Sequence, residues 1–198
     1  MKLLIASNNA HKVVEIREIL SADFPEMVTL KEAGLSIDVA ETGSTFSENA
    51  VLKAEAVLAA SGYGAALADD SGLAVDALHG APGIYSARYA GEGHNDGENN
   101  AKLMADTAQV PEGQRTCRFV CAVALARRGL PTLTAEGACE GTLLRAPRGE
   151  NGFGYDPYFY YAPFGKSFAE LSADEKNRVS HRRRALTALK ALLAAEKK

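Results

Sequence analysis

Short apolar runs and apolar residues at helical spacing alternate along the chain, and the two patterns predict different elements. Runs bounded by polar residues or glycine predict strands at residues 2–6, 28–30, 36–39, 65–69, 73–75, 116–126, 132–144 and 158–161. Apolar residues that recur three and four positions apart predict helices at residues 10–21, 45–62, 95–108 and 185–195.

Two segments of the type Ser/Thr-x-x-Glu predict where helices begin. Thr45 with Glu48 and Ser172 with Glu175 each have the composition of a capping box, in which hydroxyl and carboxylate exchange bonds with the backbone. Residues 79–93 contain glycine and proline and are too long for a simple connection, which indicates a functional loop.

The long apolar runs 116–126 and 132–144 flank a turn at residues 128–131 and predict an antiparallel hairpin. Together with the helices they predict an α/β fold, in which a long, mixed and twisted central sheet is flanked by helices on both sides. We expect a single domain over residues 1–198, and two lobes around an active cleft are compatible with this pattern.

The composition excludes several classes of protein. A net charge of −3 over 198 residues provides no field that would hold nucleic acid or an anionic membrane. No apolar run approaches the length that crosses a bilayer, and the first one reaches polar Ser7 too early for a signal peptide. Cys117, Cys121 and Cys139 lack the close pairing of a zinc site, so we expect buried free thiols and a cytoplasmic location.

Asp69 and Asp70 end an apolar run and precede Ser71-Gly72, and this pair is the strongest chemical signal in the chain. Adjacent carboxylates repel each other, and their burial is costly without a positive partner. Mg²⁺ is the simplest partner, because it prefers carboxylate and phosphate oxygens. An exposed Asp-Asp-Ser-Gly turn is the alternative, and the pair alone does not decide between the two.

The segment Ser7-Asn8-Asn9-Ala10-His11-Lys12 joins the first strand to the first helix. Backbone N–H groups, small polar side chains and a helix N-terminus together suit a phosphate. Simple N-capping by Asn8 or Asn9 explains every residue except Lys12, whose charge in the first turn is unfavourable without an anion. We therefore favour a phosphate site here.

Glu41 precedes the second helix, on which Asn49 and Lys53 share one face. Glu41 could add a third carboxylate to Asp69 and Asp70. From its spacing alone, a solvated loop acid is the simpler interpretation.

Two further segments suit a nucleotide. Phe153 and Tyr155 lie between glycines before a strand and could stack on a base, unless the rings fold back onto the core. Lys176 and Ser180-His181-Arg182 offer donors to a keto oxygen or a phosphate. Arg183 and Arg184 are assigned to a solvated helix face. Together with the acid pair, these segments describe a site for Mg²⁺ and a nucleoside triphosphate.

The chain resembles the noncanonical purine nucleoside triphosphate pyrophosphatases, also known as inosine triphosphate pyrophosphatases or dITP/XTP pyrophosphatases. The resemblance extends from Leu4 to about Leu189, and His79 departs from it, where many relatives carry glycine. The matching blocks, in the same order, are Ser7-Asn8-Asn9 with Lys12, residues 41–46, 48–54, 69–73, 81–89, 152–157 and 180–182.

The resemblance implies a cytosolic homodimer, a long mixed sheet with two lobes around the active cleft, and Mg²⁺-dependent hydrolysis of ITP, dITP and XTP to the monophosphate and pyrophosphate. By position it implies that Asp70 is the proton acceptor and a metal ligand and that Glu41 is a metal-site acid. Our own hypothesis is that Mg²⁺ binds Asp70 together with Glu41 or Asp69. The implied substrate contacts are Ser7, Asn8, Asn9, Ala10, His11, Lys12, Ser71, Phe153, Gly154, Tyr155, Asp156, Lys176, His181 and Arg182, to which we add Lys53.

Our hypothesis is that an acid helps to deprotonate a water that attacks the α-phosphorus, while the metal, Lys12, Lys53 and Lys176 neutralise phosphate charge. A donor from His181 or Arg182 would favour a 6-keto purine over adenine. Two rival functions remain. A Maf-like pyrophosphatase should lack the 152–156 and 180–182 segments, and a nucleotide- or RNA-binding protein would need no acid pair and should bind in a salt-dependent way.

Overall fold

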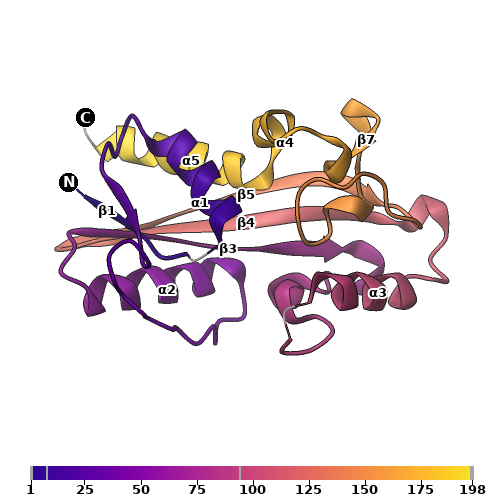
Figure 1. The fold of residues 1–198 in the computed structure, drawn as a ribbon, viewed down its shortest axis with the longest axis horizontal. Coiled ribbons are helices and arrows are strands. Elements are labelled where there is room, and N and C mark those ends of the chain that lie inside the picture. The colour runs from indigo at the N-terminus through magenta and orange to yellow at the C-terminus, as the bar shows by residue number, and fades with distance from the viewer. Residues whose placement is uncertain (1, 8, 94, 197–198) are drawn as a thin grey trace. The chain divides into compact units, whose positions relative to one another are not determined.

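The computed structural model describes residues 2–7, 9–93 and 95–196, and its strands form a mixed sheet in the order β2-β1-β3-β4-β5-β6-β7 (Figure 1). This confirms the predicted α/β class. The strands are β1 (Leu3–Ile5), β2 (Met27–Thr29), β3 (Ala65–Val75), β4 (Thr116–Arg127), β5 (Leu130–Leu143), β6 (Phe159–Tyr161) and β7 (Lys166–Ser167). The α-helices are α1 (Ala10–Leu20), α2 (Phe46–Ala60), α3 (Asp96–Asp106), α4 (Ala173–Val179) and α5 (His181–Glu196).

The sheet combines parallel and antiparallel pairs. β1 is parallel to both β2 and β3, so that Leu4 lies beside Val28 and Ala66. β6 is antiparallel to β5 and to β7. β4 and β5 are neighbours joined by Arg128 and Gly129, and this short connection makes them the predicted hairpin.

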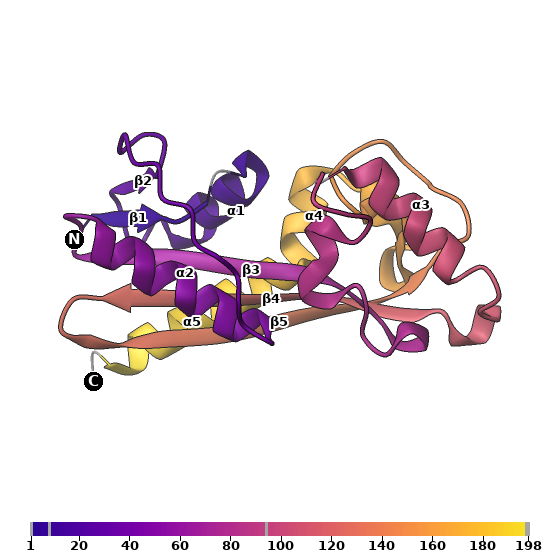
Figure 2. The ribbon, with the colours of Figure 1, turned by 90° about the horizontal axis from the view of Figure 1, so that it is seen from below.

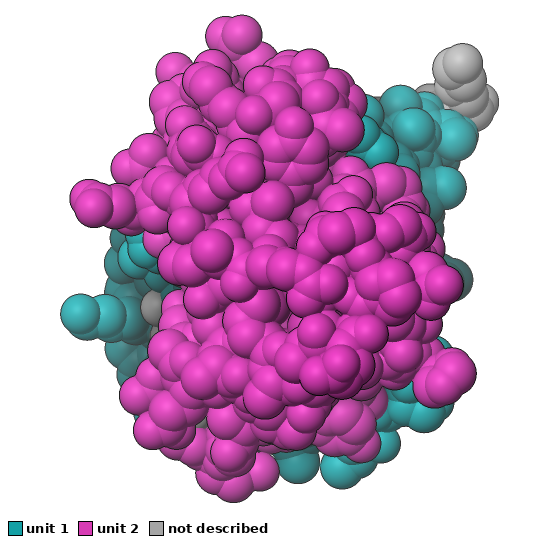
Figure 3. Space-filling view, turned by 90° about the vertical axis from the view of Figure 1, so that its right-hand side faces the viewer, with its two compact units in different colours: residues 1–70, 121–137, 182–198 teal, residues 71–120, 138–181 magenta. Residues whose placement is uncertain are grey.

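The chain forms two compact units, which Figure 3 colours separately. Unit 1 comprises residues 1–70, 121–137 and 182–198, and unit 2 comprises residues 71–120 and 138–181. Both are discontinuous in sequence, because β3, β4 and β5 each contribute residues to both units. The single domain and the active cleft expected from the sequence stay predictions.

In unit 1, α1 and α5 cover one face of the strands and α2 covers the other (Figures 1 and 2). Ile16 of α1 and Leu189 of α5 pack against Leu67 of β3 and other large apolar side chains. The α2 face is lined by small residues from three elements, namely Ala50, Ala54, Ala68, Ala122, Ala124 and Ala126. Side chains of successive strand residues point to opposite faces, so β3 serves both layers.

The core of unit 2 is aromatic. The rings of Phe119 and Phe159 lie 4.6 Å apart, and so do those of Phe159 and Phe168. Leu73 of β3 and Leu103 of α3 are fully buried in the same cluster. Aromatic rings at these separations bury a large apolar area in a fixed geometry, which gives the loops of this unit a rigid support.

Four predicted elements differ from the structure. Residues 36–39 are not a strand, since Ile37 and Val39 pack against the cluster around Leu30 without pairing. The expected strands 65–69 and 73–75 are one strand, β3. Gly72 lies within this strand, and a Cβ at its position would lie 2.3 Å from Ser86 Oγ, so the site has no room for a side chain. Helix α5 begins at His181 rather than at residue 185.

The capping predictions have different outcomes. Ser172 and Glu175 exchange both bonds of a capping box at α4. Thr45 caps α2 by accepting from the Glu48 N–H, but the Glu48 carboxylate bonds to Ser44 instead. Cys117 and Cys121 are buried and free, as expected from their apolar run, and Cys139 is buried and free as well. Among the described residues, no helix is long and apolar enough to cross a membrane.

Candidate active site

Asp69 and Asp70 are both buried in β3, with exposed fractions of 3% and 7%. Because they are consecutive strand residues, their carboxylates point to opposite faces of the sheet. Asp69 contacts Lys12 of α1 and Arg182 of α5, whereas Asp70 contacts α2. The strand therefore separates the like charges whose proximity made the sequence pattern so unusual.

Asp69 is the centre of a buried ionic cluster within unit 1. Its Oδ2 lies 3.0 Å from Lys12 Nζ and 3.2 Å from Arg182 Nε. The guanidinium of Arg182 is fully buried and also donates to Glu15 Oε2 at 3.0 Å. A lysine in the first turn of a helix is unfavourable without a nearby anion. In this structure the Asp69 carboxylate is that anion for Lys12.

The charges around Asp69 keep it ionised. Burial by itself would raise the pKa of Asp69, but Lys12, Arg182 and Lys53 outweigh it and hold this pKa below its usual value. The Oδ1 atom of Asp69 is buried and has no hydrogen-bond partner among the described residues. A buried carboxylate oxygen of this kind suits a cation or a donor from a ligand.

Asp70 faces α2, where Asn49 and Lys53 lie on one side of the helix. Asn49 Nδ2 donates to Asp70 Oδ2 at 3.1 Å, and Lys53 Nζ lies 3.4 Å from Asp70 Oδ1. Lys53 also binds Glu41 at 2.7 Å, which brings the loop acid next to Asp70. Asn49 Oδ1 accepts from the Gly43 N–H at 2.8 Å and so fixes this loop on α2.

The environment of Asp70 shifts its pKa in the opposite direction. Burial raises the pKa of Asp70, and the nearby Glu41 carboxylate adds to this, while Lys53 opposes it without cancelling it. Two neighbouring carboxylates therefore differ in basicity. Such a divergence between adjacent acids is common where one of them acts as an acid or base.

The first turn is organised by its own side chains. Asn9 is the N-cap of α1, and its Oδ1 accepts from the N–H groups of His11 and Lys12. Ser7 Oγ accepts from the Asn9 N–H, while Ala10 and His11 are exposed. Capping by Asn9 is thus confirmed, and phosphate binding stays a prediction. Asn8 lies outside the described residues.

The described residues contain no group of three His, Cys, Asp or Glu side chains that could hold a metal ion by themselves. The ammonium group of Lys53 lies against both Glu41 and Asp70. The donor set still fits Mg²⁺, which is often bound by one or two carboxylates and completed by phosphate oxygens and water.

In unit 2, the predicted nucleotide residues form a second group. Asp156 is buried, and its Oδ2 accepts from the Phe153 N–H at 2.9 Å and from Lys176 Nζ at 2.5 Å. The Lys176 ammonium also lies 4.5 Å from the centre of the Phe153 ring, a cation–π geometry. Lys176, Phe153 and Asp156 are therefore brought together, as the sequence led us to expect for one site.

Two members of this group have structural contacts that the sequence did not reveal. Tyr155 is not an exposed stacking platform, because its ring is buried in the aromatic core and its hydroxyl donates to the Ser86 carbonyl at 2.7 Å. His181 is buried and stacks on Phe119, with ring centres 4.9 Å apart. Ser71 is a half-buried residue of β3.

Sequence reasoning missed several polar residues around these groups. Glu15 shows only as one acid beside apolar residues of α1, and nothing local links it to Arg182. Asn49 could be placed on the Lys53 face but not assigned a partner. Asp96 and Asn100, discussed below, carry no signal other than their spacing of one helical turn. The role of each of these residues depends on a contact with a residue that is distant in sequence.

Comparisons with known proteins agree with the motif-based resemblance. The model of the Ham1 family matches residues 3–192. A dITP/XTP pyrophosphatase of Geobacillus kaustophilus is 52% identical over 188 residues, covering 95% of this chain and 92% of that protein. The corresponding protein of Bacillus subtilis is 47% identical over 192 residues, covering 97% and 96%. The solved structure of the Staphylococcus aureus Ham1 protein is 42% identical, with a TM-score of 0.89, and the match covers 99% of this chain and 100% of that one.

Proposed function

The chain belongs to the Ham1 family, and on this basis we propose that it hydrolyses noncanonical purine nucleoside triphosphates to the monophosphate and pyrophosphate. Relatives that match nearly the whole chain at about half identity bear the name dITP/XTP pyrophosphatase, and ITP, dITP and XTP are therefore the proposed substrates. The observation that carries the proposal is the buried carboxylate of Asp70, which Asn49 and Lys53 hold, with Glu41 bound to the same lysine. Burial raises the pKa of Asp70, which is consistent with a role as a base.

Asp70 is the proposed proton acceptor. A carboxylate with a raised pKa is a stronger base than an ordinary aspartate. Asn49 and Lys53 hold the two oxygens of Asp70 in place and would orient it toward a water. That water would attack the α-phosphorus, with pyrophosphate as the leaving group.

Lys12 and Lys53 are the proposed phosphate cations of unit 1. Each is paired with an aspartate in this structure, Lys12 with Asp69 and Lys53 with Asp70. Phosphate oxygens would compete for the same ammonium groups when substrate binds. Preplaced charges of this kind stabilise the negative charge that develops as the α–β bond breaks.

We propose Mg²⁺ as the cofactor, held by Asp70 and Glu41. The carboxylate of Asp69, the third acid expected from the sequence, points to the opposite face of β3 and contacts Lys12 and Arg182. When bound, Mg²⁺ would screen phosphate charge and lower the pKa of water. Lys53 bridges the same two carboxylates, Glu41 and Asp70, and would have to move toward the phosphates as a cation enters.

The loop 152–156, with Lys176 and His181, is the proposed nucleoside-binding group of unit 2. Arg182 of unit 1 stays a predicted substrate contact. Donors from His181 or Arg182 would bind a 6-keto oxygen and oppose the 6-amino group of adenine, because two facing donors leave a buried group unpaired. We further propose that the protein is a cytoplasmic homodimer that forms no stable complex with nucleic acid.

The test is pyrophosphate release from ITP, XTP, GTP and ATP at equal concentration, with and without Mg²⁺. We expect Mg²⁺-dependent turnover of ITP and XTP well above that of ATP and GTP. Absence of turnover with all four would reject the enzyme in favour of a nucleotide-binding protein, and equal turnover of all four would keep the chemistry and reject the selectivity.

A further inference from the structure

The loop that contains Phe153 and Tyr155 depends on contacts for its shape. Gly152 and Gly154 are both in the left-handed region, with φ of 78° and 61°. Glycine populates many backbone conformations, so a loop with two such residues is not fixed by its own sequence. Asp156 provides an internal contact by accepting from the Phe153 N–H, but this bond does not involve Gly154.

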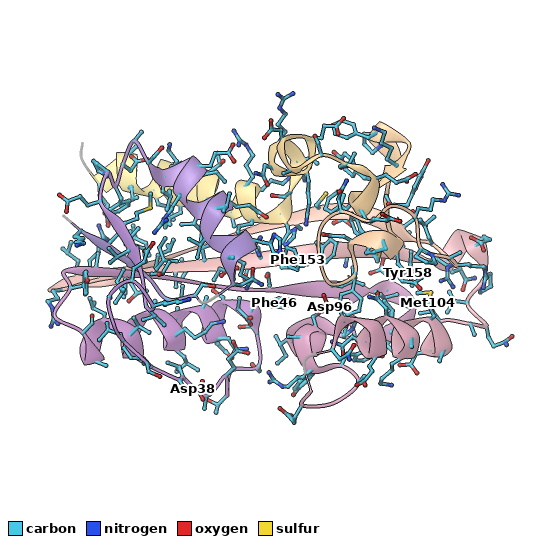
Figure 4. The ribbon with its side chains drawn as sticks, viewed as in Figure 1. Asp38, Phe46, Asp96, Met104, Phe153 and Tyr158 are labelled. Carbon is cyan, nitrogen blue, oxygen red and sulfur yellow. The ribbon has the colours of Figure 1, made fainter. Side chains whose placement is uncertain are left out.

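Gly154 is held from helix α3 through both of its backbone polar groups (Figure 4, where Asp96 and Phe153 are labelled). Its N–H donates to Asp96 Oδ2 at 2.7 Å, and its carbonyl accepts from Asn100 Nδ2 at 2.9 Å. The same Nδ2 donates to the Asp96 carbonyl at 2.8 Å, four residues earlier in the helix. Residues at this spacing share one helix face, and that face forms a two-point clamp on Gly154.

Helix α3 is itself well anchored within unit 2. Asn95 caps it by accepting from the Glu98 N–H, and Leu103 is fully buried in the aromatic core. Asn99 is buried and binds the preceding segment twice, accepting from the Ala90 N–H and donating to the Ala87 carbonyl. The clamp therefore projects from a rigid element, which is the arrangement that positions a functional loop accurately.

We propose that Asp96 and Asn100 are positioning residues, which hold Gly154 in its left-handed conformation and thereby set the loop for the nucleoside. This inference rests on the proposed function of the loop 152–156. Asp96 provides a charge-assisted bond, the stronger of the two contacts, and Asn100 fixes the direction of the Gly154 carbonyl. Without the clamp, the loop would have to be ordered when substrate binds, so affinity for the nucleoside would fall and discrimination among bases would weaken.

The test compares Asp96→Ala, Asp96→Asn and Asn100→Ala with the matched control Glu98→Ala. Asp96 and Glu98 are both acids in the first turn of α3, so each substitution removes a favourable interaction with the helix dipole. The bond to the Gly154 N–H is made by Asp96. The measurements are kcat and KM for ITP and ATP and inhibition by inorganic tripolyphosphate, which lacks a nucleoside. Thermal unfolding of each variant verifies that it is folded.

We expect Asp96→Ala to raise KM for ITP about fivefold, the size expected for the loss of one hydrogen bond, and to lower the ITP to ATP ratio of kcat/KM. Asn100→Ala should act in the same direction. Asp96→Asn retains an oxygen that can accept from Gly154 and should recover most of the affinity. Glu98→Ala and the tripolyphosphate inhibition of every variant should match the wild type.

Equal kinetics for Asp96→Ala and Glu98→Ala would overturn the clamp while leaving the proposed function intact. A loss of tripolyphosphate inhibition that parallels the loss of ITP affinity would also overturn it, because the effect would then not be specific to the nucleoside. A wild-type protein that releases no pyrophosphate from ITP would instead reject the proposed function, and with it the nucleoside role of the loop.

Discussion

The carboxylate of Glu15 accepts a bond of 3.0 Å from the guanidinium of Arg182, 167 positions later in the chain. The two residues are 5% and 0% exposed, and Asp69 completes the ionic cluster on the other side of the guanidinium. Removal of one partner of a buried ion pair leaves an uncompensated charge in a medium that solvates it poorly. The stability of unit 1 and the placement of Asp69 therefore depend on Glu15.

We predict that Glu15→Ala lowers the free energy of unfolding by ~3 kcal/mol, since Arg182 keeps Asp69 as a partner and the loss stays at the lower end for buried pairs. Urea denaturation measures it. Glu18→Ala is the control, because Glu18 lies on the same helix and pairs with Arg183 at 4.0 Å in an exposed position. The control should change stability by less than about 0.5 kcal/mol, and equal losses for the two variants would contradict the prediction.

Removing the charge of Asp70 should mainly lower activity, whereas removing the charge of Asp69 should mainly lower stability. Asp70→Asn should lower pyrophosphate release at least ~100-fold, the range of general-base catalysis, while leaving stability nearly unchanged, because burial already disfavours the Asp70 charge. Asp69→Asn should destabilise the fold by ~3 kcal/mol, because Lys12 and Arg182 lose their shared anion. Thermal unfolding and pyrophosphate release, measured for both variants, test these two expectations. An active Asp70→Asn protein would exclude Asp70 as the base.

Elements with strong periodicity could be predicted from the sequence, and buried polar contacts could not. The hairpin of β4 and β5 and the helices α1, α2 and α3 follow from apolar spacing alone. The sequence did not predict the start of α5 at His181, because His181 and Arg182 are polar and precede the apolar spacing of the helix, although the structure buries both. Their burial depends on partners from α1, β3 and β4, which no local pattern specifies.

In the candidate site, too, residue types could be predicted from the sequence and tertiary contacts could not. The sequence identified Asp69, Asp70 and Lys12 as one chemical group from residue type and spacing. It described residues 69–72 as the end of a strand and a turn, whereas β3 continues through them and directs the two acids to opposite faces. Gly72 was a turn signal in the sequence, but in the structure it permits the close approach of Ser86 and Gly83 to a strand. Close approach is a tertiary property that local composition does not encode.

The buried thiols predict a pH dependence of stability. Burial raises the pKa of Cys121 to about 12, and the charge of Asp69 adds to the effect. Burial likewise raises the pKa of Cys117 to about 12, with Asp76 and Glu140 contributing. The unfolded thiols ionise near their ordinary value of 9.0, so above that pH the unfolded state releases protons that the folded state retains.

The contribution of these thiols to the free energy of unfolding should therefore be fully present below pH 9. It should be lost progressively as the pH rises toward 12. Thermal unfolding between pH 8 and pH 11 measures the loss, and Cys121→Ala should reduce its slope. Iodoacetamide should label the native thiols slowly at pH 8 and label the urea-unfolded chain quickly. Rapid labelling of the native protein would show that the thiols are accessible, contrary to the structure.

His79 is the described non-glycine residue with a positive φ, 53°, at the end of a short 3₁₀ helix, Asp76–Leu78. A side chain in this left-handed region costs roughly 1–2 kcal/mol, which glycine avoids, although glycine loses more backbone entropy on folding. His79→Gly should therefore stabilise the protein by up to ~1 kcal/mol, because His79 is exposed and contributes little burial. Urea denaturation measures the gain. Gly80→Ala, at φ 91°, is the opposing control and should destabilise by at least ~1 kcal/mol. A loss of stability in His79→Gly would mean that contacts of the imidazole outweigh its backbone strain.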